Sequence, residues 1–234
     1  MFGGHETHSC QSLLGRRHQA HIRVMIHAAT LNVLANCEQT SPKWANLFQN
    51  VVDRLRHHGA GAKAPRVGER FPDFALPNEE GRHRTLYEML GDGPVVLSFN
   101  RGGWCPYCRR ELADWALHSS KLASFHARFV AVVPEVDGRL AILRDLLGGG
   151  AEVLCDVDHG VALRSGLAFR SDPELRRRYL ECGLDLGEIY GSDSWFLTVP
   201  ATFAIDRGGI VRFAFVEPDF RLRADPGKVI AALS

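Results

Sequence analysis

Residues 98–108, which read SFNRGGWCPYC, decide the fold of this chain. An apolar run, Val95–Phe99, leads into this stretch and predicts a buried strand. Apolar side chains then recur at helical spacing, which predicts a helix over Pro106–Phe125. Pro106 suits the first turn of that helix, because the N–H group that proline lacks would have no partner there. The sequence therefore predicts a strand, a short turn, and a helix with cysteines at its N-terminus.

The two cysteines of this turn, Cys105 and Cys108, form a C-x-x-C pair. A helix N-terminus has unpaired N–H groups and partial positive charge, and both favour a thiolate. Lowering a cysteine pKa by two units requires about 2.7 kcal/mol, whereas a helix terminus supplies about 0.3–1 kcal/mol. A nearby cation is needed for the rest, and Arg101 is the nearest candidate. A C-x-x-C pair beside a strand–helix unit indicates a thiol–disulfide redox site.

Two other interpretations of the C-x-x-C pair stay open at this point. A structural zinc ion needs two more ligands, and the sequence offers neither a second C-x-x-C pair nor two histidines at zinc-finger spacing. Two inert, buried cysteines are the other alternative. The tryptophan, proline and tyrosine around the pair favour redox chemistry, and we expect no metal and no cofactor.

Residues 101–108, RGGWCPYC, resemble the active-site turn of the peroxiredoxin-like (alkyl hydroperoxide reductase / thiol-specific antioxidant) branch of the thioredoxin superfamily. Four further segments resemble motifs of that branch in the same order along the chain: Gly68–Pro77, Val132–Glu135, Asp156–Gly160 and Val199–Asp206. The resemblance covers about residues 65–234. It implies an α/β thioredoxin-like fold, in which a central mixed sheet is flanked by helices.

The resemblance also implies a thiol-dependent oxidoreductase that acts on a hydroperoxide or a disulfide. Cys105 would attack as a thiolate, and Cys108 would then close a Cys105–Cys108 disulfide that thioredoxin or glutathione resets. Arg101 completes the predicted catalytic set. Pro200 is expected to be a cis-proline that faces the cysteines and presents the Val199 backbone to a substrate. The residues expected to bind substrate are Trp104, Pro106, Tyr107, Val199 and Pro200.

The sequence departs from the resembled family at positions that matter for peroxide chemistry. That family carries a threonine three residues before the first cysteine, where this chain has Gly102. It also carries an arginine just before the late strand, where residues 199–201 read Val-Pro-Ala. Since both side chains activate peroxide in the family, we predict slow peroxidase activity that depends on Arg101. Two alternatives remain: a thiol–disulfide reductase without useful peroxidase activity, and a redox-controlled binding module.

Composition and charge exclude several other classes of function. The chain has 234 residues, of which 45% are hydrophobic, so it is long enough to bury a substantial core. Its 28 basic and 27 acidic residues give a net charge of +1, which argues against nucleic acid as the main partner. No apolar run is long enough for a membrane span. Six cysteines are too sparse for a disulfide scaffold, which favours a reducing, cytoplasmic location. A monomer and a homodimer are both open.

The first 64 residues are predicted to lie outside the redox domain. Residues 1–40 are expected to be a poorly ordered extension, although a targeting segment stays an alternative. Residues 41–64 are predicted to form an amphipathic helix and a linker, with Ser41 as the helix cap. The apolar stripe of that helix consists of Trp44, Leu47, Phe48, Val51, Val52 and Leu55. We expect this stripe to pack within the same domain rather than against another subunit.

Residues 65–234 are predicted to form the redox domain, with strands and helices in alternation. Besides the elements at the C-x-x-C pair, the pattern predicts strands at Phe129–Val133, Glu152–Cys155, Thr202–Ile205 and Ile210–Val216, and helices at Gly138–Leu147, Gly160–Gly166, Pro173–Gly183 and from Pro226. An insertion over about residues 168–198 carries Tyr179, Tyr190 and Trp195, and we expect it to shape access to the site.

Overall fold

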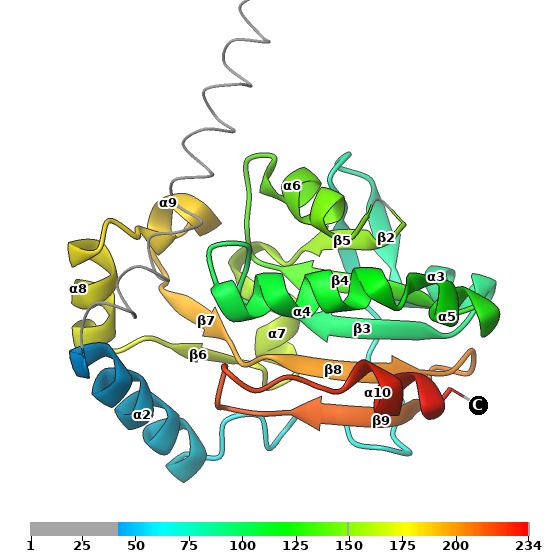
Figure 1. Ribbon diagram of the computed structural model, residues 1–234, viewed down its shortest axis with the longest axis horizontal. Coiled ribbons are helices and arrows are strands. Elements are labelled where there is room, and N and C mark those ends of the chain that lie inside the picture. The colour runs from blue at the N-terminus through cyan, green and yellow to red at the C-terminus, as the bar shows by residue number, and fades with distance from the viewer. Residues whose placement is uncertain (1–41, 149, 234) are drawn as a thin grey trace, which may run out of the picture.

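The computed structural model describes residues 42–148 and 150–233, and a five-stranded mixed sheet lies at its centre (Figure 1). The strands lie in the order β5–β4–β3–β8–β9. Their bounds are β3 Val95–Phe99, β4 Arg128–Val133, β5 Glu152–Cys155, β8 Ala201–Ile205 and β9 Val211–Val216. Strands β3, β4 and β5 are parallel, whereas β8 and β9 run antiparallel to their neighbours. The predicted fold class is confirmed.

The central strand β3 is buried along its whole length. Parallel strands that are covered on both faces have near-continuous apolar sequences, which explains the unbroken run before the C-x-x-C turn. Successive side chains point to opposite faces. Val95, Leu97 and Phe99 therefore join one hydrophobic cluster, and Val96 joins another on the opposite face. The bounds predicted for β3 and β5 are confirmed.

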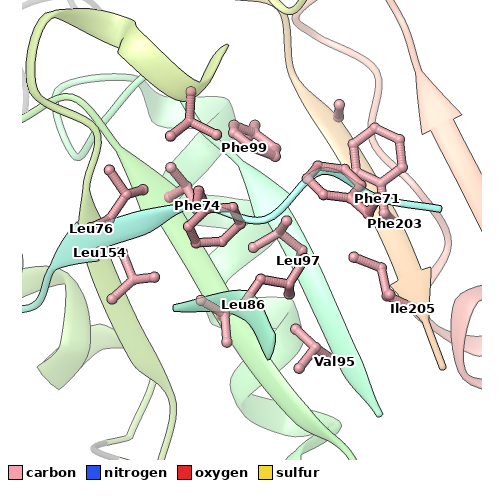
Figure 2. Packing of buried hydrophobic residues seen from close by; sticks show 14 of the residues in the cluster. Phe71, Phe74, Leu76, Leu86, Val95, Leu97, Phe99, Leu154, Phe203 and Ile205 are labelled. Carbon is pink, nitrogen blue, oxygen red and sulfur yellow. The ribbon is translucent and has the colours of Figure 1, made fainter. Parts of the chain in front are cut away.

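The first face of the sheet is covered by the chain that precedes β3. Strands β1 (Ala75–Pro77) and β2 (His83–Thr85) form an antiparallel hairpin, and helix α3 (Leu86–Asp92) follows. Figure 2 shows Phe71, Phe74 and Leu86 against the side chains of the sheet, where the rings of Phe71 and Phe203 lie 5.1 Å apart. Helix α7 (Gly160–Arg164), after the short helix η1 (Val157–His159), completes this face.

The second face is covered by helices α4 (Pro106–Leu117), α5 (Ser119–Ser124), α6 (Arg139–Leu146) and α10 (Pro226–Ala231). The single helix predicted over Pro106–Phe125 is wrong in one respect, because His118 interrupts it. The backbone N–H of His118 bonds to the carbonyl groups of Trp115 and Ala116. Its ring nitrogen Nδ1 lies 2.8 Å from the carbonyl oxygen of Asp114, which a continuous helix would have paired with the His118 N–H.

The insertion and the N-terminal helix form a third hydrophobic cluster at one end of the sheet. Helix α2 (Pro42–His57) lies beside α8 (Pro173–Glu181), as Figure 1 shows, and the rings of Trp44 and Tyr179 stack 5.9 Å apart. The insertion also holds α9 (Leu186–Tyr190) and a two-stranded sheet of β6 (Ala168–Arg170) and β7 (Phe196–Thr198). The α2 stripe is therefore buried within the chain, as predicted; Ser41 lies outside the described residues.

Helix α2 is expected to belong to the same cooperative unit as the sheet. Val52 is completely buried in the third cluster, so Val52→Ala removes two buried methyl groups and leaves a cavity. We expect its free energy of unfolding to fall by about 1.5–3 kcal/mol, measured by urea denaturation. Leu117→Ala is the control, because Leu117 is 80% exposed and its loss is expected to change stability by about 0.5 kcal/mol or less. Equal stability of the two variants would contradict this prediction.

Candidate active site

Cys105 and Cys108 lie at the carboxyl end of β3, where the turn over residues 100–105 leads into α4. Cys105 is the N-cap residue of α4 and Pro106 lies in its first turn, as the sequence predicts. Cys105 is only 1% exposed, and Cys108 is completely buried one turn further along. Both are free cysteines, so the structure is that of the reduced dithiol.

The two thiols differ in their affinity for a proton. Burial alone would raise the pKa of Cys105, but a hydrogen bond from Cys108 and the charges of Arg101 and Arg223 lower it to about 6. Burial raises the pKa of Cys108 well above its ordinary value, and the hydrogen bond to Cys105 adds to this rise. At neutral pH, Cys105 is therefore mostly a thiolate and Cys108 keeps its proton.

Arg101 is a buried cation beside this thiolate. Its guanidinium group lies between two aromatic rings, 4.8 Å from that of Trp104 and 4.3 Å from that of Phe220. Nη2 donates a hydrogen bond of 2.8 Å to the hydroxyl group of Tyr179. Nε has no hydrogen-bond partner among the described residues. Because a buried charge needs a counter-charge, the Cys105 thiolate and Arg101 stabilise each other.

The insertion contributes directly to the structure of the active-site turn. The hydroxyl group of Tyr190, at the end of α9, accepts a hydrogen bond of 2.9 Å from Trp104 Nε1. The same hydroxyl group donates a bond of 2.7 Å to the carbonyl oxygen of Arg101. Tyr179 of α8 bonds to the Arg101 side chain. Two tyrosines of the insertion therefore fix both the backbone and the guanidinium group of Arg101.

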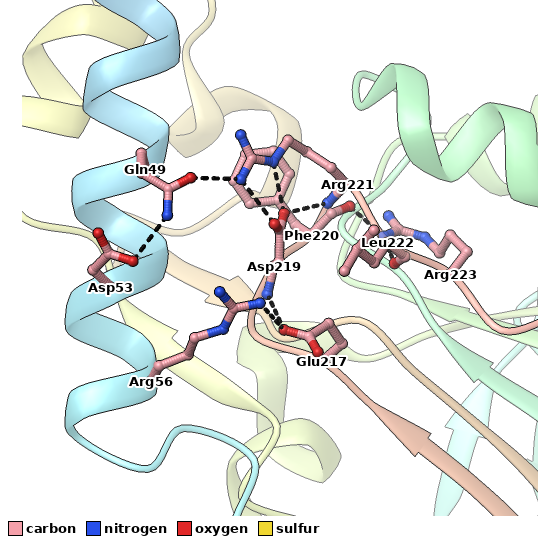
Figure 3. A network of polar contacts seen from close by, with 9 residues as sticks. All are labelled: Gln49, Asp53, Arg56, Glu217, Asp219, Phe220, Arg221, Leu222 and Arg223. Carbon is pink, nitrogen blue, oxygen red and sulfur yellow. Dashed lines mark hydrogen bonds and ion pairs between the residues drawn. The ribbon is translucent and has the colours of Figure 1, made fainter.

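Sequence reasoning missed Arg223, which lies in the irregular segment between β9 and α10. Its Nη2 atom donates to Cys108 Sγ over 3.2 Å, and its Nε atom lies 2.6 Å from Glu111 Oε2. Figure 3 shows this segment, where Glu217 and Arg221 bond to Arg56 and Gln49 of α2. Arg223 is 115 residues from Cys108 and outside any regular pattern. The sequence gives only an indirect indication. The resembled family has an arginine just before the late strand, and this chain has none there, so another segment must supply that positive charge.

Glu111 is a buried carboxyl group one turn after Cys108. Burial raises its pKa to about 7, although the charge of Arg223 opposes this rise. Its Oε1 atom accepts hydrogen bonds from Ser98 over 2.9 Å and from Thr202 over 3.2 Å. Ser98 thus joins β3 to α4 directly beneath the dithiol. Glu111 also holds Arg223 in place at Cys108.

The substrate-binding residues predicted from sequence occupy different environments. Trp104 is buried in the site, and Pro106 and Tyr107 are half-buried at the start of α4. The prediction of a cis peptide bond at Pro200 is wrong, since no peptide bond among the described residues is cis. The N–H group of Val199 already donates to the Leu167 carbonyl oxygen over 2.7 Å. Leu167, just before the insertion, thus pairs with the backbone that a cis-proline was expected to present, and the bond before Pro200 has the intrinsically preferred trans form.

A groove of about 470 Å³ runs between α4 and residues 221–226. Tyr107 and Arg110 line it from α4, and Glu111 and Arg223 are also among its lining residues. Because Arg223 contacts Cys108 Sγ, the groove comes within one side chain of the dithiol. The groove therefore brings open space close to the two buried sulfur atoms.

The remaining described cysteines do not resemble the pair. Burial raises the pKa of the Cys155 thiol to about 11, and its Sγ atom donates to the carbonyl oxygen of Glu135. Cys182 is half-buried at the end of α8. Cys10 and Cys37 lie outside the described residues. Within residues 42–148 and 150–233, no three His, Cys, Asp or Glu side chains gather in a way that could hold a metal ion. No helix in these ranges has the length and apolar character needed to cross a membrane.

Solved structures of several peroxiredoxins share this fold. Peroxidoxin BcpB of Mycobacterium tuberculosis superposes with a TM-score of 0.56 over 72% of this chain and 96% of its own, at 23% identity. Reduced Prx3 of Vibrio vulnificus, in complex with H₂O₂, gives a TM-score of 0.56 over 72% and 99%, at 17% identity. A yeast mitochondrial 1-Cys peroxiredoxin gives 0.53 over 70% and 73%, at 17% identity. At these identities the likeness concerns the fold.

Sequence comparison gives a closer relationship. A putative peroxiredoxin of Mycobacterium tuberculosis is 28% identical over 102 residues, which span 44% of this chain and 66% of that protein, just under two thirds of its length. The family model described as AhpC/TSA family matches residues 67–214. The match includes β3, the dithiol turn and α4, and it leaves out α2 and Arg223. It covers well over half of the sequence, and the chain therefore belongs to the AhpC/TSA family.

Proposed function

We propose that this protein is a thiol peroxidase that reduces hydroperoxides through a Cys105 thiolate and a Cys105–Cys108 disulfide. The observation that carries this proposal is the pairing of a thiolate with a protonated thiol inside one helical turn. Two guanidinium groups accompany the pair, one from Arg101 and one from Arg223. Membership of the AhpC/TSA family supports the same chemistry.

The reaction proceeds in two steps at the dithiol. The Cys105 thiolate attacks the terminal oxygen of the hydroperoxide, so that an S–O bond forms and the O–O bond breaks. The leaving oxygen takes up a proton and departs as an alcohol or as water. Cys108 then attacks the Cys105 sulfenic acid, the disulfide forms, and water leaves with the Cys108 proton. The hydrogen bond between the two thiols places Cys108 for this second attack.

Arg101 supplies the electrostatic stabilisation of the first step. Negative charge moves from sulfur to the leaving oxygen in the transition state, and fixed donors in a buried site stabilise such charge strongly. The unpaired Nε atom of Arg101 is a donor that needs no rearrangement to accept this role. It compensates in part for the side chains that are missing at Gly102 and at residues 199–201.

The oxidised protein needs an external thiol, and we propose thioredoxin or glutathione. The yeast 1-Cys peroxiredoxin named above resolves its thiol through glutathione and thioredoxin systems. In this chain, the groove between α4 and residues 221–226 offers a small thiol an approach to the disulfide. The buried dithiol also implies that side chains around Cys105 move when a substrate enters.

A thiol–disulfide reductase is the second candidate, favoured by the absence of a side chain at Gly102. Stopped-flow oxidation by hydrogen peroxide and reduction of a model disulfide, measured on the same reduced protein, separate the two candidates. A thiol peroxidase reacts with peroxide faster than free cysteine does, because fixed donors stabilise the leaving oxygen. Peroxide rates equal to those of free cysteine, with normal disulfide reduction, would assign the protein to the reductases.

Alkylation by iodoacetamide is expected to report the pKa of Cys105. The rate should rise with pH around a midpoint of about 6 and stay level above pH 7, because only the thiolate reacts. Peptide mass mapping should place the label on Cys105 before Cys108. In Cys108→Ala the midpoint should move upward, since a hydrogen bond that stabilises the thiolate is lost. Cys182→Ser is the control and should keep the midpoint; preferential labelling of Cys108 would reverse the assigned roles.

A further inference from the structure

Glu135 lies directly against the active-site turn. The mechanism proposed above gives this residue no role. It follows β4, and its backbone is held in place because its carbonyl oxygen accepts from Cys155 Sγ over 3.1 Å. The Glu135 side chain is 2% exposed. Its carboxyl group accepts hydrogen bonds from the N–H groups of Gly103 and Trp104, the two residues before Cys105. The carboxyl group is therefore hydrogen-bonded to the turn that carries the reactive thiolate.

The Glu135 side chain fills the space beside Gly102, so a larger residue at position 102 would require it to move. A Cβ atom built on Gly102 would lie 2.6 Å from Glu135 Oε1 and 2.7 Å from its Cδ atom. The backbone of Gly102 has a φ of +120°, a conformation that residues other than glycine rarely adopt. The space that a side chain at position 102 would fill is thus occupied by a carboxyl group from the chain that follows β4.

One oxygen of this carboxyl group has no partner. Glu135 Oε2 is buried and makes no hydrogen bond with any described residue. A buried polar atom without a partner is unfavourable for folding, so it calls for a functional explanation. A proton on Oε2 turns this atom into a hydrogen-bond donor beside the sulfur-bearing turn.

The groups around Glu135 allow it to carry a proton near neutral pH. Burial raises the pKa of Glu135 to about 7, against the hydrogen bonds of the turn and the charge of Arg139 on α6. The other titratable groups that face it are Cys108 and Arg109 on α4, Cys155 on β5 and Tyr190 on α9. Cys105, in contrast, is mostly ionised above pH 6. Between about pH 6 and pH 7, Cys105 is thus mostly a thiolate while much of Glu135 still carries its proton.

We propose that Glu135 is the general acid that protonates the oxygen leaving from the hydroperoxide. The Cys105 thiolate forms the S–O bond, the O–O electron pair passes to the leaving oxygen, and the Glu135 proton completes the alcohol. Sulfenic acid on Cys105 and a Glu135 carboxylate remain. When an external thiol reduces the disulfide, Cys105 ionises again and its proton returns to Glu135, so the cycle balances. This inference rests on the proposed peroxidase function.

The pH dependence of two reactions of the wild-type protein tests this inference without any substitution. Oxidation by hydrogen peroxide should rise through pH 6 and fall again above pH 7, because it needs both the thiolate and the Glu135 proton. Alkylation by iodoacetamide should rise and stay level, because iodide leaves without a proton. Peroxide and alkylation profiles of the same shape would overturn the role of Glu135.

The matched variants are Glu135→Gln and Glu188→Gln. The amide in Glu135→Gln keeps the shape and one donor group but carries no transferable proton, so oxidation at pH 6.5 should slow by about 10- to 100-fold and lose its falling limb. Glu188 is exposed on α9, and its variant should behave as wild type. Unchanged alkylation of Glu135→Gln shows that the turn is intact. Peroxide oxidation of wild type no faster than that of free cysteine, with normal alkylation, would instead contradict the peroxidase function itself.

Discussion

Cys105→Ser is expected to abolish the reaction of the dithiol with hydrogen peroxide, slowing oxidation by about 1,000-fold or more. A serine hydroxyl group stays protonated at neutral pH and is a weak nucleophile, whereas the Cys105 thiol is mostly ionised. The fluorescence of Trp104, the residue before Cys105, reports oxidation in a stopped-flow instrument. Cys182→Ser is the control and should oxidise at the wild-type rate.

Cys108→Ser separates the two steps of the reaction. Its hydroxyl group can still donate a hydrogen bond to the Cys105 thiolate, so the first oxidation should remain fast. The disulfide cannot form, and a sulfenic acid on Cys105 should accumulate and be seen by mass spectrometry as one added oxygen atom. Rapid oxidation of Cys105→Ser at another residue would show that the reactive thiolate has been assigned to the wrong cysteine.

Arg101→Met is expected to slow peroxide reduction by about 100- to 1,000-fold. The substitution removes a donor toward the leaving oxygen and the largest of the arginine charges that lower the pKa of Cys105. Alkylation at pH 9, where about half of an ordinary thiol is also ionised, should be much less affected than peroxide oxidation. That difference would separate the loss of the donor from the loss of thiolate.

The control for Arg101 is Arg110→Met, on the exposed side of α4. It removes the same charge from the same neighbourhood without touching the dithiol, so its peroxide rate should stay within about two-fold of wild type. Arg101→Lys keeps the charge but loses the bond geometry to Tyr179, and an intermediate rate is expected. Full activity of Arg101→Met would show that Arg223 alone supplies the cation.

The parts of the fold that could be predicted from sequence are those with a strong local signal. The run Val95–Phe99 is apolar throughout because β3 is covered on both faces, and its bounds are confirmed. The segment Gly68–Pro77, which resembles the family's entry strand, contains β1. No pattern predicts the three-residue strands β2, β6 and β7, because so few residues cannot display an alternation. The capping box of Thr85 and Glu88 does mark the start of α3 in the sequence.

The candidate site likewise contains residues that a local pattern predicts and residues that it does not. Cys105, Cys108 and Arg101 lie within eight residues of one another, so their proximity follows from one turn and one helix start. Arg223 and Glu135 reach the same place from distant segments, through tertiary packing that no local pattern records. The cis form predicted for Pro200 is wrong, and here too a tertiary contact is involved, because the Val199 N–H bonds to Leu167, just before the insertion.

The Cys105 thiolate, which the charges of Arg101 and Arg223 stabilise, also sets how readily the protein accepts electrons. A drop in the pKa of Cys105 from its ordinary 9.0 to about 6 stabilises the reduced dithiol by about 1.4 kcal/mol at pH 7, and the disulfide has no such gain. The reduction potential should therefore lie about 30 mV above that of an unperturbed dithiol. This difference grows as pH rises toward 9 and vanishes below pH 6, where Cys105 is protonated in either case. The Cys105–Cys108 disulfide that we propose would thus be easily reduced, which suits an enzyme that must be reset after every turnover.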